Sequence, residues 1–161
     1  MNYDSLIPIT GIIQNISQTP NDCCHQFITV RTPNGINHFV VSPDTIVIGN
    51  TRLRPRMPIA AFYDASLPVP LIFPPQYQAQ LLAPLRGNET VMLNFFQRNL
   101  TAADNSLRLN LDRSTEISTI NGQPYPCPPG NQYLLVYYSA TTRSIPPQTT
   151  PRKIVVLCQG T

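Results

Sequence analysis

The chain has 161 residues, of which 42% are hydrophobic and only 12% are charged, and its net charge is +3. Disordered chains combine low hydrophobicity with high net charge, so this composition excludes intrinsic disorder. The apolar runs are no longer than a strand, which excludes a membrane-spanning helix. The first residues contain neither a basic stretch nor a long apolar stretch, so we expect no secretory signal and synthesis in the cytoplasm.

The first half of the chain shows short runs of β-branched and aromatic residues and no helical periodicity. The strands predicted from these runs are 9–16, 26–31, 37–41, 45–48, 58–63 and 76–82. The sequence Pro33-Asn34-Gly35 is a tight-turn signal, so we expect the second and third strands to form a hairpin.

The second half continues the same pattern. Its predicted strands are 90–96, 107–111, 116–120, 132–138 and 152–157. Residues 107–111 alternate between apolar and polar, which predicts one buried face and one solvent-exposed face. Residues 134–138 and 154–157 are continuous apolar runs, so we expect both of their faces to be covered.

The two halves are similar to each other in sequence. Residues 62–66 (FYDAS), with prolines following at 74–75, return as residues 137–141 (YYSAT), with prolines following at 146–147. Residues 42–46 (SPDTI) return as residues 112–117 (DRSTEI), and each copy then reaches an Asn/Gly turn. The offset between the copies is about 70 to 76 residues. We therefore predict an internal duplication, with repeat 1 in residues 1–86 and repeat 2 in residues 87–161.

Five or six short strands in a repeat of this size close into a small barrel more easily than they form a sandwich. Closure also removes the edge strands, which promote aggregation in a charge-poor protein. An OB-fold usually has a helix between its third and fourth strands. Here the turn residues Gly49, Asn50 and Pro55 leave room only for a loop or a single turn. The predicted fold is all-β, with two tandem OB-like small barrels related by internal duplication.

The most specific stretch of the chain is residues 62–77 (FYDASLPVPLIFPPQY). Together with residues 11–13 (GII), 39–41 (FVV) and 79–81 (AQL), it resembles uncharacterised OB-like small β-barrel proteins of spore-forming, Gram-positive anaerobic bacteria. The function of that family is undefined, so the resemblance implies no catalytic residue. The resemblance implies deposition on the spore or cell surface. The residues themselves predict only synthesis in the cytoplasm and leave the final location of the protein unknown.

The chain contains four cysteines: Cys23, Cys24, Cys127 and Cys158. No two of them have C-x-x-C spacing, and neither histidine lies at zinc-finger spacing from them, so no metal site is predicted. A nucleophilic site at Cys23-Cys24-His25 has no glycine-rich oxyanion loop beside it, so no catalytic residue and no cofactor are predicted. We expect Cys23 and Cys24 in a polar loop. All four cysteines are either reduced thiols or candidate intermolecular disulfides.

Two further features are candidate binding surfaces. Proline-rich segments precede the last strand of each half, and the first one contains a candidate subunit-docking loop formed by Val69, Leu71, Ile72 and Phe73. Without a partner, these apolar side chains would be exposed to water. The simpler interpretation of the proline-rich segment is a rigid connection across the barrel end. Arg52, Arg54 and Arg56 form a candidate anion patch, for which a solvated face is the simpler interpretation.

Two groups of side chains are expected to be structural. Asp44 and Asp112 lie near the repeated threonine, where a short polar side chain satisfies turn backbone. Tyr63, Tyr137 and Tyr138 occupy apolar strands and are expected to pack in the core.

These features predict a non-enzymatic structural or interaction protein that self-associates, in a spore- or surface-linked assembly. Its partner is then a second copy of the chain or another protein. The alternative is an OB-type binding module for single-stranded nucleic acid or oligosaccharide. Nucleic acid is the less favoured partner, because the chain has no strongly basic stripe.

Overall fold

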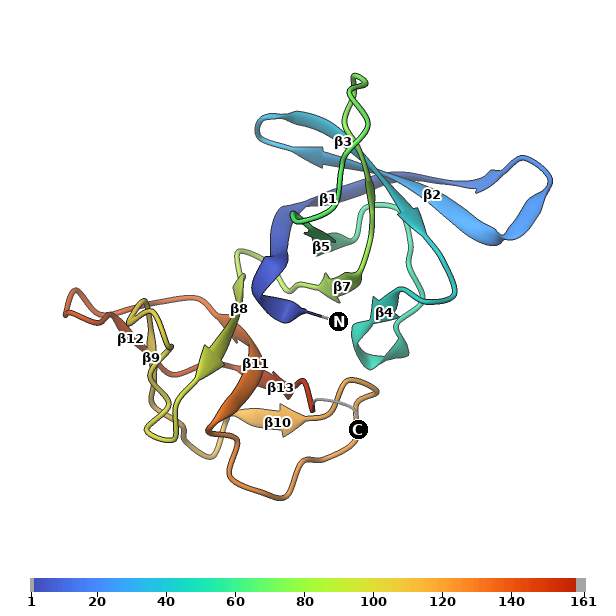
Figure 1. The fold of residues 1–161 in the computed structure, drawn as a ribbon. Helices are drawn as coiled ribbons and strands as arrows, with labels where there is room; N and C mark the ends of the chain where they lie inside the picture. The colour runs from blue at the N-terminus through green and yellow to red at the C-terminus, as the bar shows by residue number, and fades with distance from the viewer. Residues whose placement is uncertain (1, 159–161) are drawn as a thin grey trace. The chain divides into compact units, whose positions relative to one another are not determined.

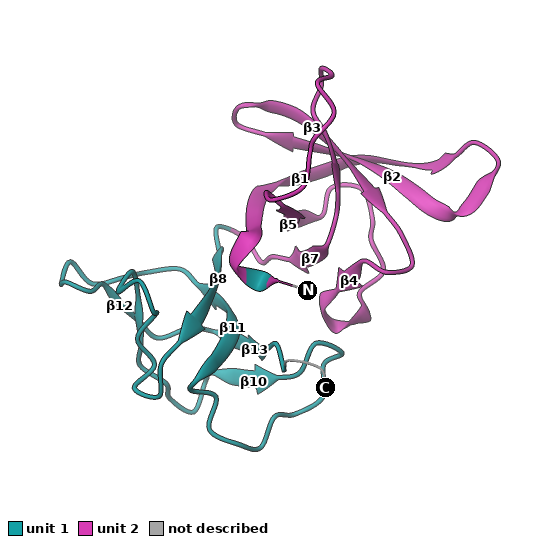
Figure 2. Cartoon of the chain, viewed as in Figure 1, with its two compact units in different colours: residues 1, 3, 88–161 teal, residues 2, 4–87 magenta. Residues whose placement is uncertain are grey.

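The computed structural model of the chain describes residues 2–158. All regular structure in this range is strand, apart from two three-residue 3₁₀ turns, η1 (Tyr3–Ser5) and η2 (Ile48–Asn50). The predicted all-β class is confirmed, and η2 is the single turn expected in place of a helix. The chain divides into two compact units, an N-terminal unit of residues 4–87 and a C-terminal unit that begins at Asn88 (Figure 2). Of the residues before Asp4, Asn2 belongs to the N-terminal unit and Tyr3 to the C-terminal unit.

The N-terminal unit contains a seven-stranded sheet in the order β4-β7-β5-β1-β2-β3-β6 (Figure 1). Its strands are β1 (Leu6–Thr19), β2 (Asp22–Thr32), β3 (Gly35–Val41), β4 (Ile46–Val47), β5 (Pro58–Asp64), β6 (Gln76–Gln78) and β7 (Leu81–Pro84). The long strand β1 pairs with β5 through its first half and with β2 through its second half. The predicted hairpin of β2 and β3 is confirmed, and Gly35 in its turn has a φ of 129°, which favours glycine.

The strand predicted at residues 76–82 is interrupted. β6 runs parallel to β3, whereas β7 runs antiparallel to β5. Between them, the Ala79 N–H donates to the Val40 carbonyl at 3.0 Å, and the Gln80 N–H donates to the Phe62 carbonyl at 2.8 Å. The chain therefore changes its partner strand at these two residues.

The C-terminal unit contains a four-stranded sheet in the order β10-β13-β11-β8 and a parallel pair, β12-β9. Its strands are β8 (Thr90–Phe96), β9 (Arg108–Leu109), β10 (Glu116–Ser118), β11 (Gln132–Tyr138), β12 (Gln148–Thr149) and β13 (Lys153–Val156). The predicted strands 90–96 and 132–138 match β8 and β11 at both ends. β12 has only two residues, and no sequence pattern predicts it.

Strand pairing within the described residues leaves both sheets open. The edges of the seven-stranded sheet are β4 and β6, and those of the four-stranded sheet are β10 and β8. The closed barrels and the internal duplication therefore stay predictions.

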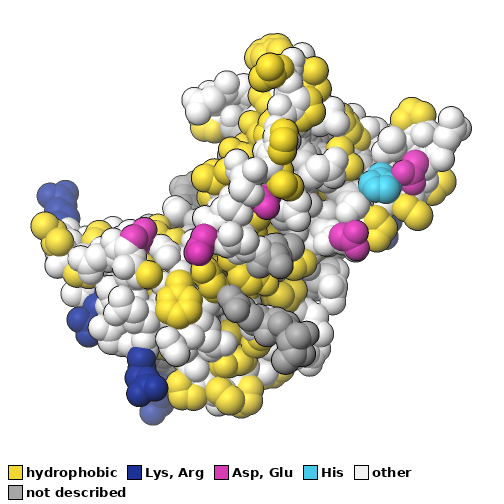
Figure 3. All heavy atoms as spheres, viewed as in Figure 1, with side chains coloured by type: hydrophobic (Ala, Val, Ile, Leu, Met, Phe, Trp, Pro, Cys, Tyr) yellow, Lys and Arg dark blue, Asp and Glu magenta, His cyan; other side chains and the backbone are white. Residues whose placement is uncertain are grey.

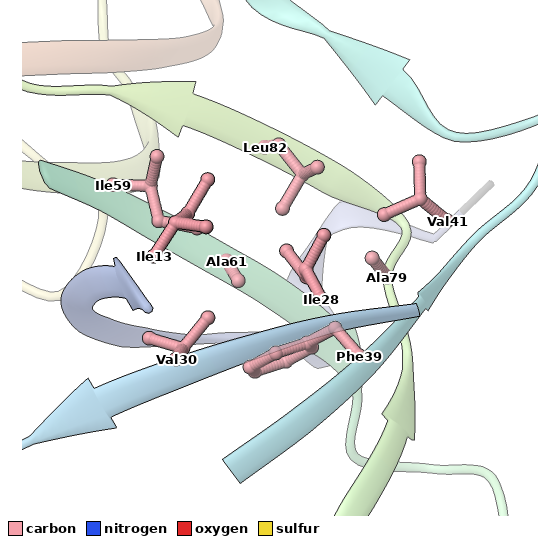
Figure 4. Close-up of a cluster of buried hydrophobic side chains, with 9 residues drawn as sticks. All are labelled: Ile13, Ile28, Val30, Phe39, Val41, Ile59, Ala61, Ala79 and Leu82. Carbon is pink, nitrogen blue, oxygen red and sulfur yellow. The ribbon is translucent and has the colours of Figure 1, made fainter. Parts of the chain in front are cut away.

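Each unit has a hydrophobic core of its own. In the N-terminal unit the core lies between β1, β2, β3, β5 and β7 and comprises Ile13, Ile28, Val30, Phe39, Val41, Ile59, Ala61, Ala79 and Leu82 (Figure 4). The core of the C-terminal unit comprises Phe96, Ala102, Leu107, Leu109, Leu134, Val136, Ile154 and Val156. Leu135, Tyr137 and Val155, which alternate with these residues, are buried as well. β11 and β13 are therefore covered on both faces, as predicted.

Candidate interaction surfaces

The segment between β5 and β6, residues 65–75, is termed the first proline loop and exposes apolar side chains. Leu71 is fully exposed and Phe73 is 95% exposed. Leu67, Val69 and Ile72 in the same loop are exposed as well. Figure 3 shows hydrophobic side chains gathered on this loop at the top of the view. The side chains of the candidate docking loop are thus all accessible.

Polar contacts hold both ends of the first proline loop. At its start, the Asp64 carboxylate accepts hydrogen bonds from the Ser66 N–H at 2.9 Å and the Ser66 hydroxyl at 2.6 Å. The hydroxyl bond in particular stabilises the ionised carboxylate and lowers the pKa of Asp64. At its end, the Pro75 carbonyl accepts a hydrogen bond from the His38 N–H at 2.8 Å. The loop is anchored at its base while its apolar tip lies in solvent.

The segment between β11 and β12, residues 139–147, is termed the second proline loop. Its tip residue Ile145 is 93% exposed. The Pro147 carbonyl accepts a hydrogen bond from the Arg108 N–H at 2.8 Å, as Pro75 does from His38. Ile145 was not among the predicted site residues. The signal was nevertheless present, because Ile145 precedes two prolines as Phe73 does.

A hollow of about 490 Å³ lies beside the first proline loop. Apolar groups of Pro8, Ile9, Ile36, Phe73 and Pro75 line much of it, and none of the described residues around it is charged. Phe73 and Pro75 belong to both the loop and the hollow, so apolar groups of the loop continue into the hollow, which Thr10, Thr32, Asn34 and Asn37 also line.

The second proline loop borders a hollow of different chemistry. This hollow has a volume of about 620 Å³ and is lined mainly by hydroxyl and amide side chains, together with Arg152. Several of these groups already bond to one another, including the Asn110 amide with Gln148 at 3.0 Å and the Thr149 hydroxyl with the Ala140 carbonyl at 2.6 Å. These side chains of the hollow are thus already engaged in hydrogen bonds within the C-terminal unit.

An aromatic pair lies on the outer face of β2 and β3. The rings of Phe27 and His38 are 4.9 Å apart at an angle of 31°, and His38 Nδ1 lies 3.1 Å from the Thr29 hydroxyl. His38 is half-buried. Ile28 points into the core, so Phe27, Thr29 and the exposed Arg31 share the outer face.

All four cysteines are free and exposed. The expectation that Cys23 and Cys24 lie in a polar loop is wrong, because β1 and β2 extend beyond the predicted ends and place both residues in β2. The two strands extend into this polar stretch, and Asn21, with a φ of 62°, closes the turn between them. Cys127 and Cys158 lie outside the strands.

The three arginines of the candidate anion patch lie between η2 and β5. Arg52, Arg54 and Arg56 are all exposed, and Leu53 and Met57 pack against the core. This inward packing explains the alternation in the sequence. Within residues 2–158 the three guanidinium groups take part in no hydrogen bond or ion pair. The patch is accessible, and a solvated face stays the other interpretation.

An ion pair in the C-terminal unit, between the buried Glu89 and the partly buried Arg152, was not predicted. Arg152 donates to both carboxylate oxygens of Glu89, from Nε at 2.6 Å and from Nη2 at 2.8 Å. The guanidinium lies over the Tyr137 ring, 5.4 Å from its centroid, and burial raises the pKa of Tyr137. Glu89 and Arg152 are far apart in the sequence, so no local pattern indicates the pair.

No protein-family model, curated protein or solved structure matches the chain. The resemblance to OB-like proteins of spore-forming bacteria therefore stays a prediction. Among residues 2–158, no helix has the length and apolarity needed to cross a membrane. The described side chains also contain no group of three or more His, Cys, Asp or Glu residues placed to hold a metal ion.

Proposed function

We propose that this protein is a non-enzymatic structural or interaction protein that self-associates through its two proline loops. The observation that carries the proposal is the exposure of large apolar side chains at both tips, Leu71 and Phe73 in one unit and Ile145 in the other. Scattered exposed apolar side chains need no explanation, but a contiguous apolar surface marks an interaction site. The first proline loop, in which Leu67, Val69, Leu71, Ile72 and Phe73 are all exposed, is the candidate for such a surface.

The partner that this surface suits is a second copy of the chain. Residues 65–75 carry no charge, and residues 139–147 carry only Arg143. Two such surfaces can meet without like-charge repulsion. With a loop in each unit, one copy can contact more than one neighbour, and contacts of this heterologous kind build open assemblies. A spore- or surface-linked location is the part of the proposal that rests on the sequence resemblance alone.

The test is the oligomeric state under reducing conditions, where disulfides make no contribution. By sedimentation velocity, we expect the mass of the natural chain to increase with concentration. The double variant Leu71→Ser/Phe73→Ser is expected to stay monomeric over the same range, and Ile145→Ser to form smaller assemblies.

The matched control is Ile12→Ser, which alters an apolar side chain that is 40% exposed but lies outside both loops. We expect it to associate as the natural chain does. A natural chain that stays monomeric at every concentration, or a double variant that associates normally, would contradict the proposal.

We also propose that each unit is an OB-like barrel and that the two arose by duplication. Corresponding strands of the two units pair in the same sense. The antiparallel pair β1–β5 corresponds to β8–β11, and the antiparallel pair β5–β7 corresponds to β11–β13. The parallel pair β4–β7 corresponds to β10–β13, and the parallel pair β3–β6 corresponds to β9–β12. Residues 76–84 also pass from pairing with β3, through β6, to pairing with β5, through β7, and such a crossing is what a last strand that closes a five-stranded barrel requires. An experimental structure in which these strands superpose supports the duplication, and differing strand orders refute it.

A second candidate function is the binding of single-stranded nucleic acid or oligosaccharide on the outer face of β2 and β3. The observation in its favour is the Phe27–His38 ring pair with the exposed Arg31 on the same face. Aromatic rings stack with bases, and a neighbouring arginine attracts the backbone.

This second function is tested by fluorescence anisotropy with a labelled single-stranded oligonucleotide and a labelled oligosaccharide. Oligonucleotide binding that weakens with salt, and that is lost in Phe27→Ala, supports it. Binding of neither probe, or binding that Phe27→Ala leaves unchanged, refutes it.

A further inference from the structure

The end of the β1–β2 hairpin presents two thiols that cannot readily bond to each other. Cys23 and Cys24 are both exposed and free, and the peptide bond between them is trans. Their Cα atoms are therefore about 3.8 Å apart. A disulfide requires a Cα separation of about 4.4 to 6.8 Å, so closing a bond between these neighbours requires the backbone to leave its strand conformation.

This hairpin end extends beyond the rest of its sheet (Figure 1). β3 pairs with β2 only as far as Gln26, and β5 pairs with β1 only as far as Ile12. The last part of the hairpin is thus two strands wide. A register shift on β1 between Gln18 and Thr19 leaves Cys23 and Cys24 without an opposing residue. Their side chains therefore lie where another molecule can approach them.

Local hydrogen bonds hold the backbone that carries the two thiols. The Cys24 N–H donates to the Asp22 carboxylate at 3.0 Å, and the Thr19 hydroxyl donates to the His25 carbonyl at 3.3 Å. These bonds engage Asp22 and His25, the residues on either side of Cys23 and Cys24, and favour the conformation in which the two thiols stay separate.

We infer that Cys23 and Cys24 together form a two-way crosslinking site, through which each copy of the chain becomes disulfide-bonded to two other copies at the same hairpin end. This site is distinct from the proline loops, because crosslinking uses the hairpin end alone. One thiol per hairpin produces dimers, whereas two thiols that cannot bond to each other produce chains of copies.

The reaction is thiol–disulfide exchange with a low-molecular-weight disulfide as the oxidant. The thiolate of one copy attacks a sulfur of the small disulfide, forms a mixed disulfide and releases one small thiolate. The thiolate of a second copy then attacks the protein sulfur of that mixed disulfide and releases the other small thiolate. Two protein thiols are oxidised to one disulfide, and one small disulfide is reduced to two thiols.

The test uses the full chain carrying Cys127→Ser and Cys158→Ser, so that only the hairpin thiols remain. This background, its Cys23→Ser derivative and its Cys24→Ser derivative are incubated with glutathione disulfide and compared on non-reducing gels and by intact mass. We expect a ladder of trimers and larger species in the background and no species beyond the dimer in either derivative. Dithiothreitol is expected to return all species to monomers.

Three outcomes would overturn the inference. A background that stays monomeric with the mass of two hydrogens lost shows a bond between the neighbouring cysteines. Mixed disulfides with glutathione and no crosslinks show that the thiols do not reach another copy. A background that stops at the dimer shows a doubly bonded pair of copies in place of a chain. Adding Leu71→Ser/Phe73→Ser to the background is expected to leave the ladder in place, so the two proposals fail separately.

Discussion

Glu89 and Arg152 form a bidentate ion pair, with hydrogen bonds of 2.6 and 2.8 Å, in which the Glu89 side chain is only 4% exposed. Glu89 directly precedes β8, and Arg152 directly precedes β13. The backbone N–H of Arg152 also donates to the Tyr137 carbonyl on β11 at 3.0 Å. The pair therefore joins three of the strands of the C-terminal sheet at one end.

Replacing Arg152 is expected to destabilise the protein strongly. Arg152→Ala leaves a buried carboxylate without its cation, and we expect the free energy of unfolding to fall by about 3 kcal/mol in urea denaturation. Arg152→Lys keeps the charge but loses the two-point geometry, so its loss is expected to be smaller.

The control for this prediction is Glu116→Gln. It removes an exposed contact, in which Lys153 Nζ lies 3.6 Å from Glu116, and its expected effect is under about 1 kcal/mol. Equal losses in Arg152→Ala and Glu116→Gln would show that the buried pair is not structural.

The repeated threonine of the N-terminal unit provides a second prediction. The Thr45 hydroxyl donates to the Ala79 carbonyl at 2.8 Å and accepts a hydrogen bond from the Ser42 N–H at 3.0 Å. Thr45→Val keeps the shape but leaves both backbone groups without this partner, so we expect a loss of about 1 to 3 kcal/mol in the free energy of unfolding.

Thr45→Ser keeps the hydroxyl and is the matched control for Thr45→Val. If the valine and serine variants unfold at the same urea concentration, these bonds do not stabilise the fold. Thr115, the counterpart in the other unit, donates to the Pro151 carbonyl at 2.8 Å. Because no backbone N–H in the described residues bonds to this hydroxyl, Thr115→Val is expected to cost less than Thr45→Val.

Local patterns were sufficient to predict most strands and one hairpin. Pro33-Asn34-Gly35 correctly indicated the turn between β2 and β3, and the continuous apolar runs correctly indicated strands buried on both faces. These features depend on turn chemistry and burial within a few residues. The same information could not reveal the interruption at Ala79 and Gln80, because it arises where two distant strands each take one hydrogen bond from the chain.

Turn residues show where local reasoning fails. Asp112 was expected to satisfy turn backbone, and its carboxylate accepts the Ser114 N–H at 2.8 Å. The same expectation for Asp44 is wrong. In that turn the oxygen atoms come from Ser42 and Thr45, and Asp44 only donates its N–H to Ser42 at 3.1 Å. When several short polar residues share a turn, the sequence does not say which one supplies the acceptor.

The candidate sites could be predicted from the sequence to different degrees. The exposed tip of the first proline loop followed from apolar residues between prolines, and Ile145 could have been found from the repeat. Glu89 and Arg152 meet only through the pairing of β11 with β8 and β13. Contacts of this kind are set by the tertiary fold and have no local signal.

Gly11 is expected to tolerate no side chain. It lies on β1 where that strand passes from β5 to β2, and a Cβ there would be 2.4 Å from the Arg31 carbonyl oxygen and 2.7 Å from Val30 Cγ1. Backbone cannot move away as a flexible side chain can, so Gly11→Ala is expected to lower the free energy of unfolding by about 2 to 3 kcal/mol. Gln14→Ala, at an exposed position of the same strand, is the control, with an expected change within about 0.5 kcal/mol. Equal thermal midpoints for the two variants would contradict this steric argument.

Asp104 is expected to make stability depend on acid pH. Its carboxylate accepts hydrogen bonds from the Ser106 hydroxyl at 2.6 Å, the Ser106 N–H at 3.1 Å and the Asn94 amide at 3.0 Å. The Ser106 hydroxyl bond is the largest cause that lowers the pKa of Asp104 below the ordinary 3.8. The folded state thus binds the proton more weakly than the unfolded state, whose pKa is about 3.9. The stabilisation is complete well above that pKa and is lost as the pH falls through the lower folded pKa.

Urea denaturation of the natural chain and of Asp104→Asn at several acidic and neutral pH values measures this contribution. We expect the natural chain to be the more stable at neutral pH and the difference to shrink once the pH falls below about 4. Asp44→Asn is the control, because no hydrogen bond to the Asp44 carboxylate occurs within the described residues. Its stability difference from the natural chain should change less with pH. A difference for Asp104→Asn that is the same at every pH would mean that its hydrogen bonds do not favour the ionised carboxylate.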